Sequence, residues 1–308
     1  MALTTITNKL PGTTVRSGAQ HAVRRILGLA SKVNPLWAAD LGLLAFSTPL
    51  RRRKLDGDPL PVKTRIRPTW INGREVTLYQ YGKSSRKVLL VHGWEGAACD
   101  FGDYFEPLVQ AGYEVCAVDL PGHGLSSGSH LNVSEVAKIV QSLEIMHGPY
   151  SAIIGHSFGA FSAGHAISQF SELSGMPFVS IGSPNTLQSV LSSFSEVAGL
   201  TNLQSNYMIC KIEKKFGIKI RDFKQSSFLA RHNGPTLVVH DELDKQVPIH
   251  EVEEMQREAT NVDYLVTAGL GHNRILRDKK TIHSIIAYID GWRDSREDFE
   301  MAFKFGII

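Results

Sequence analysis

The sequence predicts an α/β fold in which helices cover both faces of a mostly parallel sheet. From about residue 65 onward, short β-rich runs alternate with helical stretches along the chain. A repeated strand–helix–strand order is typical of parallel sheets. The later β-rich runs are also apolar throughout rather than alternating, as expected of central strands between two helical layers.

Seven runs have the composition of β-strands, and five stretches between them have the pattern of helices. The expected strands are Glu75–Tyr79, Val88–Val91, Glu114–Val118, Ala152–Ile154, Phe178–Ile181, Thr236–Val239 and Tyr264–Val266. The expected helices are Phe101–Ala111, Ser134–Met146, Ser157–Phe170, His250–Glu258 and Thr281–Trp292.

Residues 185–232 interrupt the alternation, because they contain helical stretches but no clear strand. Insertions of this length between core strands are commonly lids or binding loops, so a cap is expected here. Its apolar residues have helical spacing, and Leu191 and Phe194 are expected to contact substrate; the alternative is a helix that only pads the core. These apolar residues are Leu187, Val190, Leu191, Phe194, Val197 and Leu200.

Residues 1–62 form a second departure and are interpreted as an N-terminal helical extension. Ala22–Val33 and Leu36–Phe46 have the pattern of two helices broken at Pro35, and the basic run Arg51–Lys54 follows. The favoured interpretation is that their apolar faces pack on the main domain. The alternative is that residues 21–54 make weak contact with a membrane surface. The core then comprises residues 63–184 and 233–308, with the cap between them.

Composition disfavours several classes of protein. The 308 residues carry 33 Lys+Arg against 30 Asp+Glu, an excess too small and too scattered for a nucleic-acid binder. The three cysteines, Cys99, Cys116 and Cys210, form no C-x-x-C pair, so neither a metal site nor a disulfide framework is expected. With no signal-peptide pattern and no apolar run near the roughly 18 residues of a membrane span, a cytoplasmic protein is expected.

The stretch Ile153–Ala160 carries the strongest chemical signal. It contains the pattern G-x-S-x-G, formed by Gly155, Ser157 and Gly159, between an apolar strand and a helix. A serine in such a sharp turn adopts a strained backbone, and the glycines leave room for the neighbouring chain. The turn lifts the hydroxyl above the sheet at the positive end of the helix, which predicts a nucleophile.

A serine nucleophile needs a base and a group that orients the base. His272 follows the last β-rich run on a glycine-rich loop, and Asp244 follows the strand before it. The order Ser157, Asp244, His272 is the one expected of a triad on this fold. Asp241 is the alternative acid, but Asp244 is favoured because the carboxylate must reach out on the loop to meet the histidine.

Two backbone N–H groups are expected to stabilise the oxyanion. One belongs to Phe158, directly after the nucleophile, and the other to Trp94 in the turn after Val88–Val91. Trp94 and His156 are also expected beside the substrate, although His156 could simply pack. His92 and His123 are interpreted as histidines that hold their own turns.

Taken together, these motifs resemble the α/β-hydrolase superfamily. The motifs are the His92-Gly93 turn, the turn Asp119–Gly124, the serine turn, the D-x-x-V-P run Asp244–Pro248 and the pair Gly271-His272. The resemblance implies a sheet of about eight strands with helices on both faces and a short helical cap at residues 185–232.

The resemblance also implies a serine esterase or lipase-like enzyme. It would cleave a carboxylic ester or thioester through an acyl-enzyme on Ser157, with His272 as general base oriented by Asp244, and without metal or cofactor. The substrate would be a small ester, thioester or lipid-like acyl compound. Two alternatives remain open: an acyltransferase using the same triad, and a non-catalytic binding protein on the same scaffold.

Overall fold

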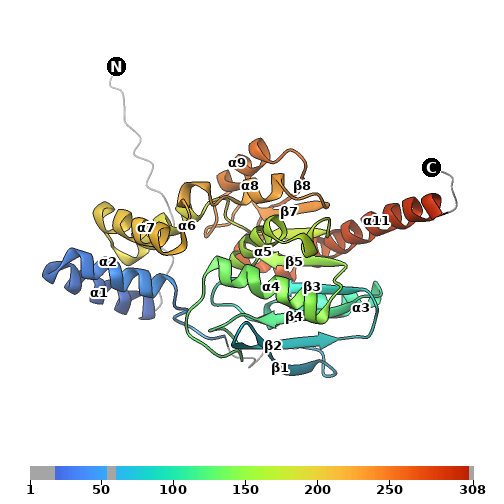
Figure 1. The fold of residues 1–308 in the computed structure, drawn as a ribbon, viewed down its shortest axis with the longest axis horizontal. Helices are drawn as coiled ribbons and strands as arrows, with labels where there is room; N and C mark the ends of the chain where they lie inside the picture. The colour runs from blue at the N-terminus through green and yellow to red at the C-terminus, as the bar shows by residue number, and fades with distance from the viewer. Residues whose placement is uncertain (1–17, 54–59, 305–308) are drawn as a thin grey trace, which may run out of the picture.

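The computed structural model describes residues 18–53 and 60–304 and contains an eight-stranded, mostly parallel sheet with helices on both faces (Figure 1). The strand order is β1-β2-β4-β3-β5-β6-β7-β8, and strands β3 to β8 run parallel while β2 is antiparallel to both its neighbours. The strands are β1 (Arg65–Ile71), β2 (Arg74–Tyr81), β3 (Lys87–Val91), β4 (Glu114–Asp119), β5 (Ala152–His156), β6 (Phe178–Ile181), β7 (Thr236–Asp241) and β8 (Asp263–Thr267). The predicted fold class is confirmed.

Two helical layers bury the two faces of the sheet. Helices α4, α5, α8 and α9 pack on one face, whereas α3 and α11 pack on the other. Strand β3 shows why the central strands are apolar throughout: Leu89 and Val91 belong to the first layer, and Val88 and Leu90 to the second. The helices are α3 (Gly102–Gln110), α4 (Val133–His147), α5 (Phe158–Gln169), α8 (Gln225–Ala230), α9 (His250–Glu258), α10 (Gly271–Arg274) and α11 (Lys279–Lys304).

Strand β1 was not expected from the sequence, and β8 is found where it was expected but differs in its position within the sheet. The local signal for β1 was the Asn72-Gly73 pair, whose positive φ values of 51° and 75° form the tight turn to β2. Pro68 and the charged Arg65 and Arg67 make the sequence of β1 unlike that of a core strand, and most of its side chains are exposed. Strand β8 lies at the edge of the sheet and leaves Val266 exposed, so the expectation that the later strands are all central is wrong there.

Residues 185–232 form the helical layer expected between β6 and β7. The layer contains α6 (Leu187–Ala198) and α7 (Asn202–Phe216), followed by α8. Thr186 and Thr201 cap α6 and α7 by accepting hydrogen bonds from the amides of Ser189 and Gln204. Each of these two helices ends at a glycine with positive φ, as helices commonly do.

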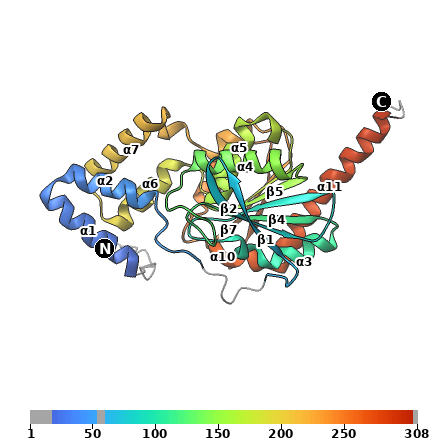
Figure 2. The ribbon, with the colours of Figure 1, turned by 60° about the horizontal axis from the view of Figure 1, so that its bottom comes forward.

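The N-terminal helices are α1 (Gly18–Val33) and α2 (Pro35–Phe46), and the predicted break at Pro35 is confirmed. Pro35 occupies the first turn of α2, where its missing N–H costs nothing, and the Asn34 side chain caps that helix. Both helices pack mainly on α6 and α7, and the two views place this helical group to one side of the sheet (Figures 1 and 2). The favoured interpretation placed these helices on the main domain, whereas their main partners are the cap helices; Ala39 also shares a cluster with Val133 and Phe161 of the sheet domain.

Specific contacts hold the N-terminal helices on the cap helices. The Arg24 guanidinium donates to the carbonyl oxygens of Glu196 and Val197, and the Gln204 side chain donates to Ser31 Oγ at 2.9 Å. Phe46 meets the Phe194 ring edge-on, with 5.2 Å between centroids. None of the described helices is both long and apolar enough to cross a bilayer.

Candidate active site

Ser157 lies at the sharp turn between β5 and α5 with φ 51° and ψ −119°. A non-glycine residue rarely adopts this region, so the predicted backbone strain is present. Only glycine fits at the flanking positions Gly155 and Gly159, because any side chain there would clash with neighbouring atoms. A Cβ on Gly155 would lie 2.5 Å from Ala160 Cα, and one on Gly159 would lie 2.3 Å from the His92 carbonyl oxygen. The turn therefore holds the serine side chain at the carboxyl edge of the sheet.

Asp244 and His272 are brought together at the same edge. The His272 Nδ1–H donates to Asp244 Oδ2 at 2.6 Å, and both side chains are buried. Asp244 follows β7, and His272 lies in the one-turn helix α10 after β8 rather than on a simple loop. Ser157 and His272 line one polar pocket of about 480 Å³.

Within the described part of the chain, no hydrogen bond joins Ser157 Oγ to His272. Such contacts are often long in enzymes without substrate and shorten when substrate binds. Burial raises the pKa of Asp244, but its hydrogen bond and charge interaction with His272 and the amides of Val247 and Gln246 outweigh that effect and hold this pKa below its usual value. Asp244 is therefore a charged acceptor at neutral pH.

Asp241, the alternative acid, has different partners. Its carboxylate accepts hydrogen bonds from the amides of Leu243, Leu270 and Gly271 and from the Thr267 hydroxyl. These bonds join the segment after β7 to the segment that carries His272. The structure thus places Asp244, and not Asp241, against the imidazole, while Asp241 ties the two segments together.

His156 packs against His272. Its Nε2–H donates to the His272 carbonyl oxygen at 3.0 Å, and the two ring centroids are 4.8 Å apart. Burial, with a smaller contribution from the charge of His272, lowers the pKa of His156 to about 3. A neutral His156 is thereby a positioning residue for the segment that carries His272, although it also lines the polar pocket.

The turn after β3 passes directly beside Ser157. A Cβ on Gly93 would lie 3.0 Å from Ser157 Cβ, and the Gly96 amide closes the turn on the Gly93 carbonyl oxygen at 3.1 Å. The Trp94 amide has no hydrogen-bond acceptor among the described residues, and the Phe158 amide is the first of α5, where no intrahelical acceptor exists. The placement suits two donors for an oxyanion, and that role stays a prediction.

His92, His123 and Asp119 hold the neighbouring turns. His92 Nε2 accepts from the Leu120 amide at 3.0 Å, and its Nδ1–H donates to the Gly93 carbonyl oxygen at 2.7 Å. Buried Asp119 accepts from the hydroxyl of Tyr79 and from the amides of Ala98 and Leu125. His123 Nδ1–H donates to the Pro121 carbonyl oxygen at 3.0 Å, so the contacts of His92 and His123 fit the structural roles expected of them.

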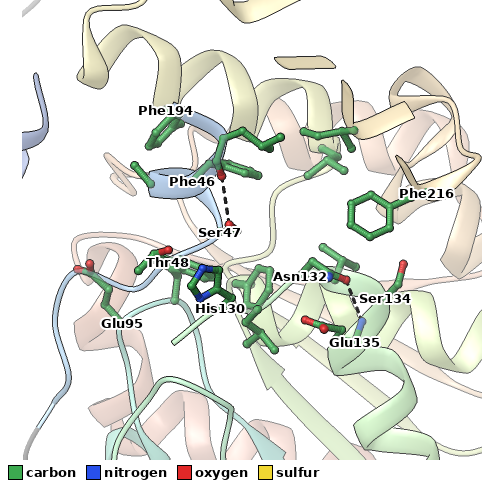
Figure 3. A pocket seen from close by; sticks show the side chains of 18 of the residues that line it. Phe46, Ser47, Thr48, Glu95, His130, Asn132, Ser134, Glu135, Phe194 and Phe216 are labelled. Carbon is green, nitrogen blue, oxygen red and sulfur yellow. Dashed lines mark hydrogen bonds between the residues drawn. The ribbon is translucent and has the colours of Figure 1, made fainter. Parts of the chain in front are cut away.

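A second, mostly apolar cavity of about 720 Å³ adjoins the polar pocket. Trp94, Glu95 and Gln246 line both, so they mark the passage between the two. In Figure 3, Phe46 and Phe194 lie on one side of this cavity, and His130 and Asn132 on the other. Its walls come from α2, from the cap helices and from the sheet domain together.

The two predicted substrate-contacting residues of the cap are placed differently. Phe194 lines the apolar cavity. Leu191, three residues earlier, is 3% exposed and packs in a cluster with Ala39, Met208 and Ile212, and it lines neither cavity. Leu191 faces the N-terminal helices, which sequence reasoning had placed elsewhere, so its expected substrate contact is not supported.

Three arginines of the polar pocket were missed by the sequence analysis. Arg51, Arg53 and Arg277 line it together with Ser157 and His272. The only signal in the sequence for Arg51 and Arg53 is the basic run after the second helix. That this segment crosses the pocket depends on the tertiary structure. Among the described residues, no group of three or more His, Cys, Asp or Glu side chains could hold a metal ion.

Comparison with known proteins bears on the family and the fold. The sequence profile of the alpha/beta hydrolase family matches residues 88–205. Residues 88–205 are therefore similar in sequence to that family, and solved structures share its fold. A serine hydrolase-like protein of Dictyostelium discoideum is 34% identical over 84 residues. That match spans 25% of this chain and only 23% of the relative.

Solved structures show the same hydrolase fold at low sequence identity. An esterase of Pyrococcus furiosus is 18% identical with a TM-score of 0.57, covering 79% of this chain and 97% of that one. The thioesterase domain of the curacin biosynthetic pathway is 17% identical with a TM-score of 0.53, covering 73% and 99%. A bromoperoxidase of Bacillus anthracis is 17% identical with a TM-score of 0.56, covering 73% and 100%.

The buried histidines predict how the stability of the fold changes with pH. Burial is the main cause that lowers the pKa of His156 and His123 to about 3 and that of His165 to about 4. These side chains stay neutral in the fold but gain a proton in the unfolded chain below about pH 6.5. We expect the free energy of unfolding to fall between pH 6.5 and 4, by up to roughly 1.4 kcal/mol per pH unit for each histidine.

His156→Gln, which keeps a donor for the His272 carbonyl, should make this fall shallower. The exposed His283→Gln is the control and should leave the slope unchanged. Urea unfolding at several pH values between 8 and 4 measures both slopes. A slope in His156→Gln equal to that of the wild type would contradict the assignment of a neutral, buried His156.

Proposed function

We propose that this protein is a serine hydrolase that cleaves a carboxylic ester or thioester. The observation that carries the proposal is the 2.6 Å hydrogen bond between Asp244 and His272 in the pocket that also contains the strained Ser157. A pure binding protein has no physical need for these three groups at one sheet edge. The names of similar proteins, an esterase, a thioesterase domain and a serine hydrolase-like protein, support the same class.

In the proposed reaction, Ser157 Oγ attacks the acyl carbon while His272 Nε2 takes its proton. The carbonyl oxygen becomes an oxyanion held by the Trp94 and Phe158 amides. The intermediate collapses, and the alcohol or thiol leaves with the proton from His272. Water, activated by the same histidine, then attacks the acyl-Ser157 ester and releases the acid, and the charged Asp244 stabilises the imidazolium in both halves.

We further propose that the acyl chain occupies the apolar cavity. That cavity begins at Trp94 beside the oxyanion donors and continues between the cap and the sheet domain. Residues 185–232 thus act as the substrate cap, and the N-terminal extension 1–62 completes it through the described helices α1 and α2. The polar pocket, with its three arginines, takes the alcohol or thiol side of the bond and the attacking water.

Ser157→Ala is expected to abolish labelling by a fluorophosphonate probe and to remove nearly all turnover of p-nitrophenyl esters and acyl thioesters. Ser162→Ala is the matched control, because Ser162 is buried in α5 and its hydroxyl has no hydrogen-bond partner among the described residues. That variant should label and turn over as the wild type does. Labelling that persists in Ser157→Ala would contradict the assigned nucleophile, and a wild type that neither labels nor turns over would contradict the hydrolase.

Asp244→Asn is expected to lower kcat by about four orders of magnitude, because the neutral amide cannot hold the imidazole in the required tautomer or stabilise its charged form. Asp241→Asn should lower kcat far less and reduce Tm, since its amide nitrogen would meet backbone donors now bound by the carboxylate. Steady-state kinetics at matched folded fractions compare the two. A larger loss of kcat in Asp241→Asn would overturn the choice of acid.

Phe194→Trp is expected to shift the preferred acyl chain toward shorter lengths, because the larger ring fills part of the apolar cavity. Leu191→Trp should instead lower Tm through overpacking and leave the chain-length profile unchanged, because Leu191 is buried away from the cavity. Rates with a series of p-nitrophenyl esters of graded length measure the profile. An unchanged profile in Phe194→Trp would contradict the proposal that the acyl chain occupies this cavity.

A further inference from the structure

Exposed apolar side chains gather on the N-terminal helices. Of the 18 large hydrophobic residues that are exposed in the described part of the chain, eight lie between residues 26 and 50. Val33 is 75% exposed and Trp37 60%. Soluble surfaces carry single exposed hydrophobic residues, but a concentration of this kind marks an interaction surface. The eight are Ile26, Leu29, Val33, Leu36, Trp37, Leu41, Leu44 and Leu50.

Helical spacing places most of these side chains in one row on each helix. Ile26, Leu29 and Val33 are three and four residues apart in α1. In α2, the corresponding row is Trp37, Leu41 and Leu44. We define these six residues as the outer apolar rows.

The opposite face of α2 is occupied by the rest of the protein. Ala38, Ala39 and Gly42 are buried there. A Cβ on Gly42 would lie 3.1 Å from both Leu200 Cδ1 and Met208 Sδ, so the helix cannot approach the cap more closely. Helix α2 therefore uses its small residues to pack on the cap, and its large apolar residues are left to solvent. Packing within the chain does not explain why the large apolar side chains of α2 are exposed.

The same segment carries a local excess of positive charge. Residues 18–53 contain six Arg and Lys against a single acid, Asp40, although the whole chain has a net charge of only +3. Asp40 is paired with Lys211 of α7. All of Arg24, Arg25, Lys32, Arg51 and Arg52 are exposed; Arg24 and Arg52 also donate to backbone carbonyl oxygens. An apolar surface flanked by exposed cations is complementary to an anionic lipid surface.

We propose that α1 and α2 dock this protein on anionic membranes, with the outer apolar rows inserted at the boundary between headgroups and acyl chains. Trp37 has the amphipathic ring that favours this depth. A second copy of the chain would bring the same cations against each other, so the charge favours lipid as the occupant. Leu43, Phe46 and Leu50 of the same segment line the apolar cavity, and Figure 3 shows Phe46 there. Docking would therefore bring the wall of the cavity that this segment forms next to the lipid surface.

Flotation of the full chain with phosphatidylcholine vesicles, with and without one quarter phosphatidylglycerol, tests the proposal. The wild type should float with the anionic vesicles, and added salt should weaken binding. The double variant Leu29→Glu/Trp37→Glu should bind at least tenfold more weakly. Its control is Ile145→Glu/Met146→Glu, which changes two exposed apolar residues of α4 and should bind as the wild type does. Equal Tm values establish that the variants fold.

Further variants test the contribution of the cations and distinguish membrane docking from dimer formation. Arg25→Gln/Lys32→Gln should reduce binding to anionic vesicles while leaving Tm unchanged. Ser157→Ala should float like the wild type, so the result does not depend on the proposed hydrolase. Absence of wild-type flotation, or flotation that Leu29→Glu/Trp37→Glu leaves intact, would overturn the proposal. A wild-type dimer in gel filtration that this variant disperses, without flotation, would assign the surface to a second copy.

Discussion

The path of the chain through Ser157 constrains the rest of the site. The backbone leaves β5 and enters α5 within one residue, and contacts on both sides leave no wider route: Gly155 lies against Ala160, and Gly159 against the carbonyl oxygen of His92. Strain of this kind persists only where surrounding packing holds it. Here β5 is paired on both sides with parallel strands, and the Ser157 amide donates to the Ile181 carbonyl oxygen. The stability of the central sheet therefore maintains the serine in its unusual conformation.

The segment that carries His272 depends on that sheet through polar contacts rather than through an apolar core. Asp241 accepts the amides of Leu270 and Gly271, His156 donates to the His272 carbonyl oxygen, and Asp244 accepts from the imidazole. Each partner is attached to the end of β5 or β7. Because these bonds are largely buried, breaking one leaves a polar group without water and costs more than the bond contributes when intact. The imidazole is thus oriented by its surroundings before any substrate enters.

The helical layer above the sheet edge combines two distant parts of the chain. Helices α1 and α2 come before the first strand, and α6 and α7 lie between the sixth and seventh, yet Ala39 shares one cluster with Leu191 and Met208. This pairing decides which side chains reach the cavity and which become core. It also leaves α1 and α2 with one face on the cap and the other face exposed, the arrangement on which the proposed membrane contact rests.

The sequence by itself determined the fold class, seven of the strands, the break at Pro35, and the positions at which Ser157, Asp244 and His272 follow their strands. These features are local: they depend on apolar runs, on turn residues and on chain order. Tertiary structure alone decided that β8 is an edge strand, that Asp241 binds the amides of the segment carrying His272, that Leu191 is core while Phe194 lines the cavity, and that Arg277 reaches the pocket. The physical reason is that each of these depends on which residue from a distant part of the chain occupies the neighbouring space, and no local pattern carries that information.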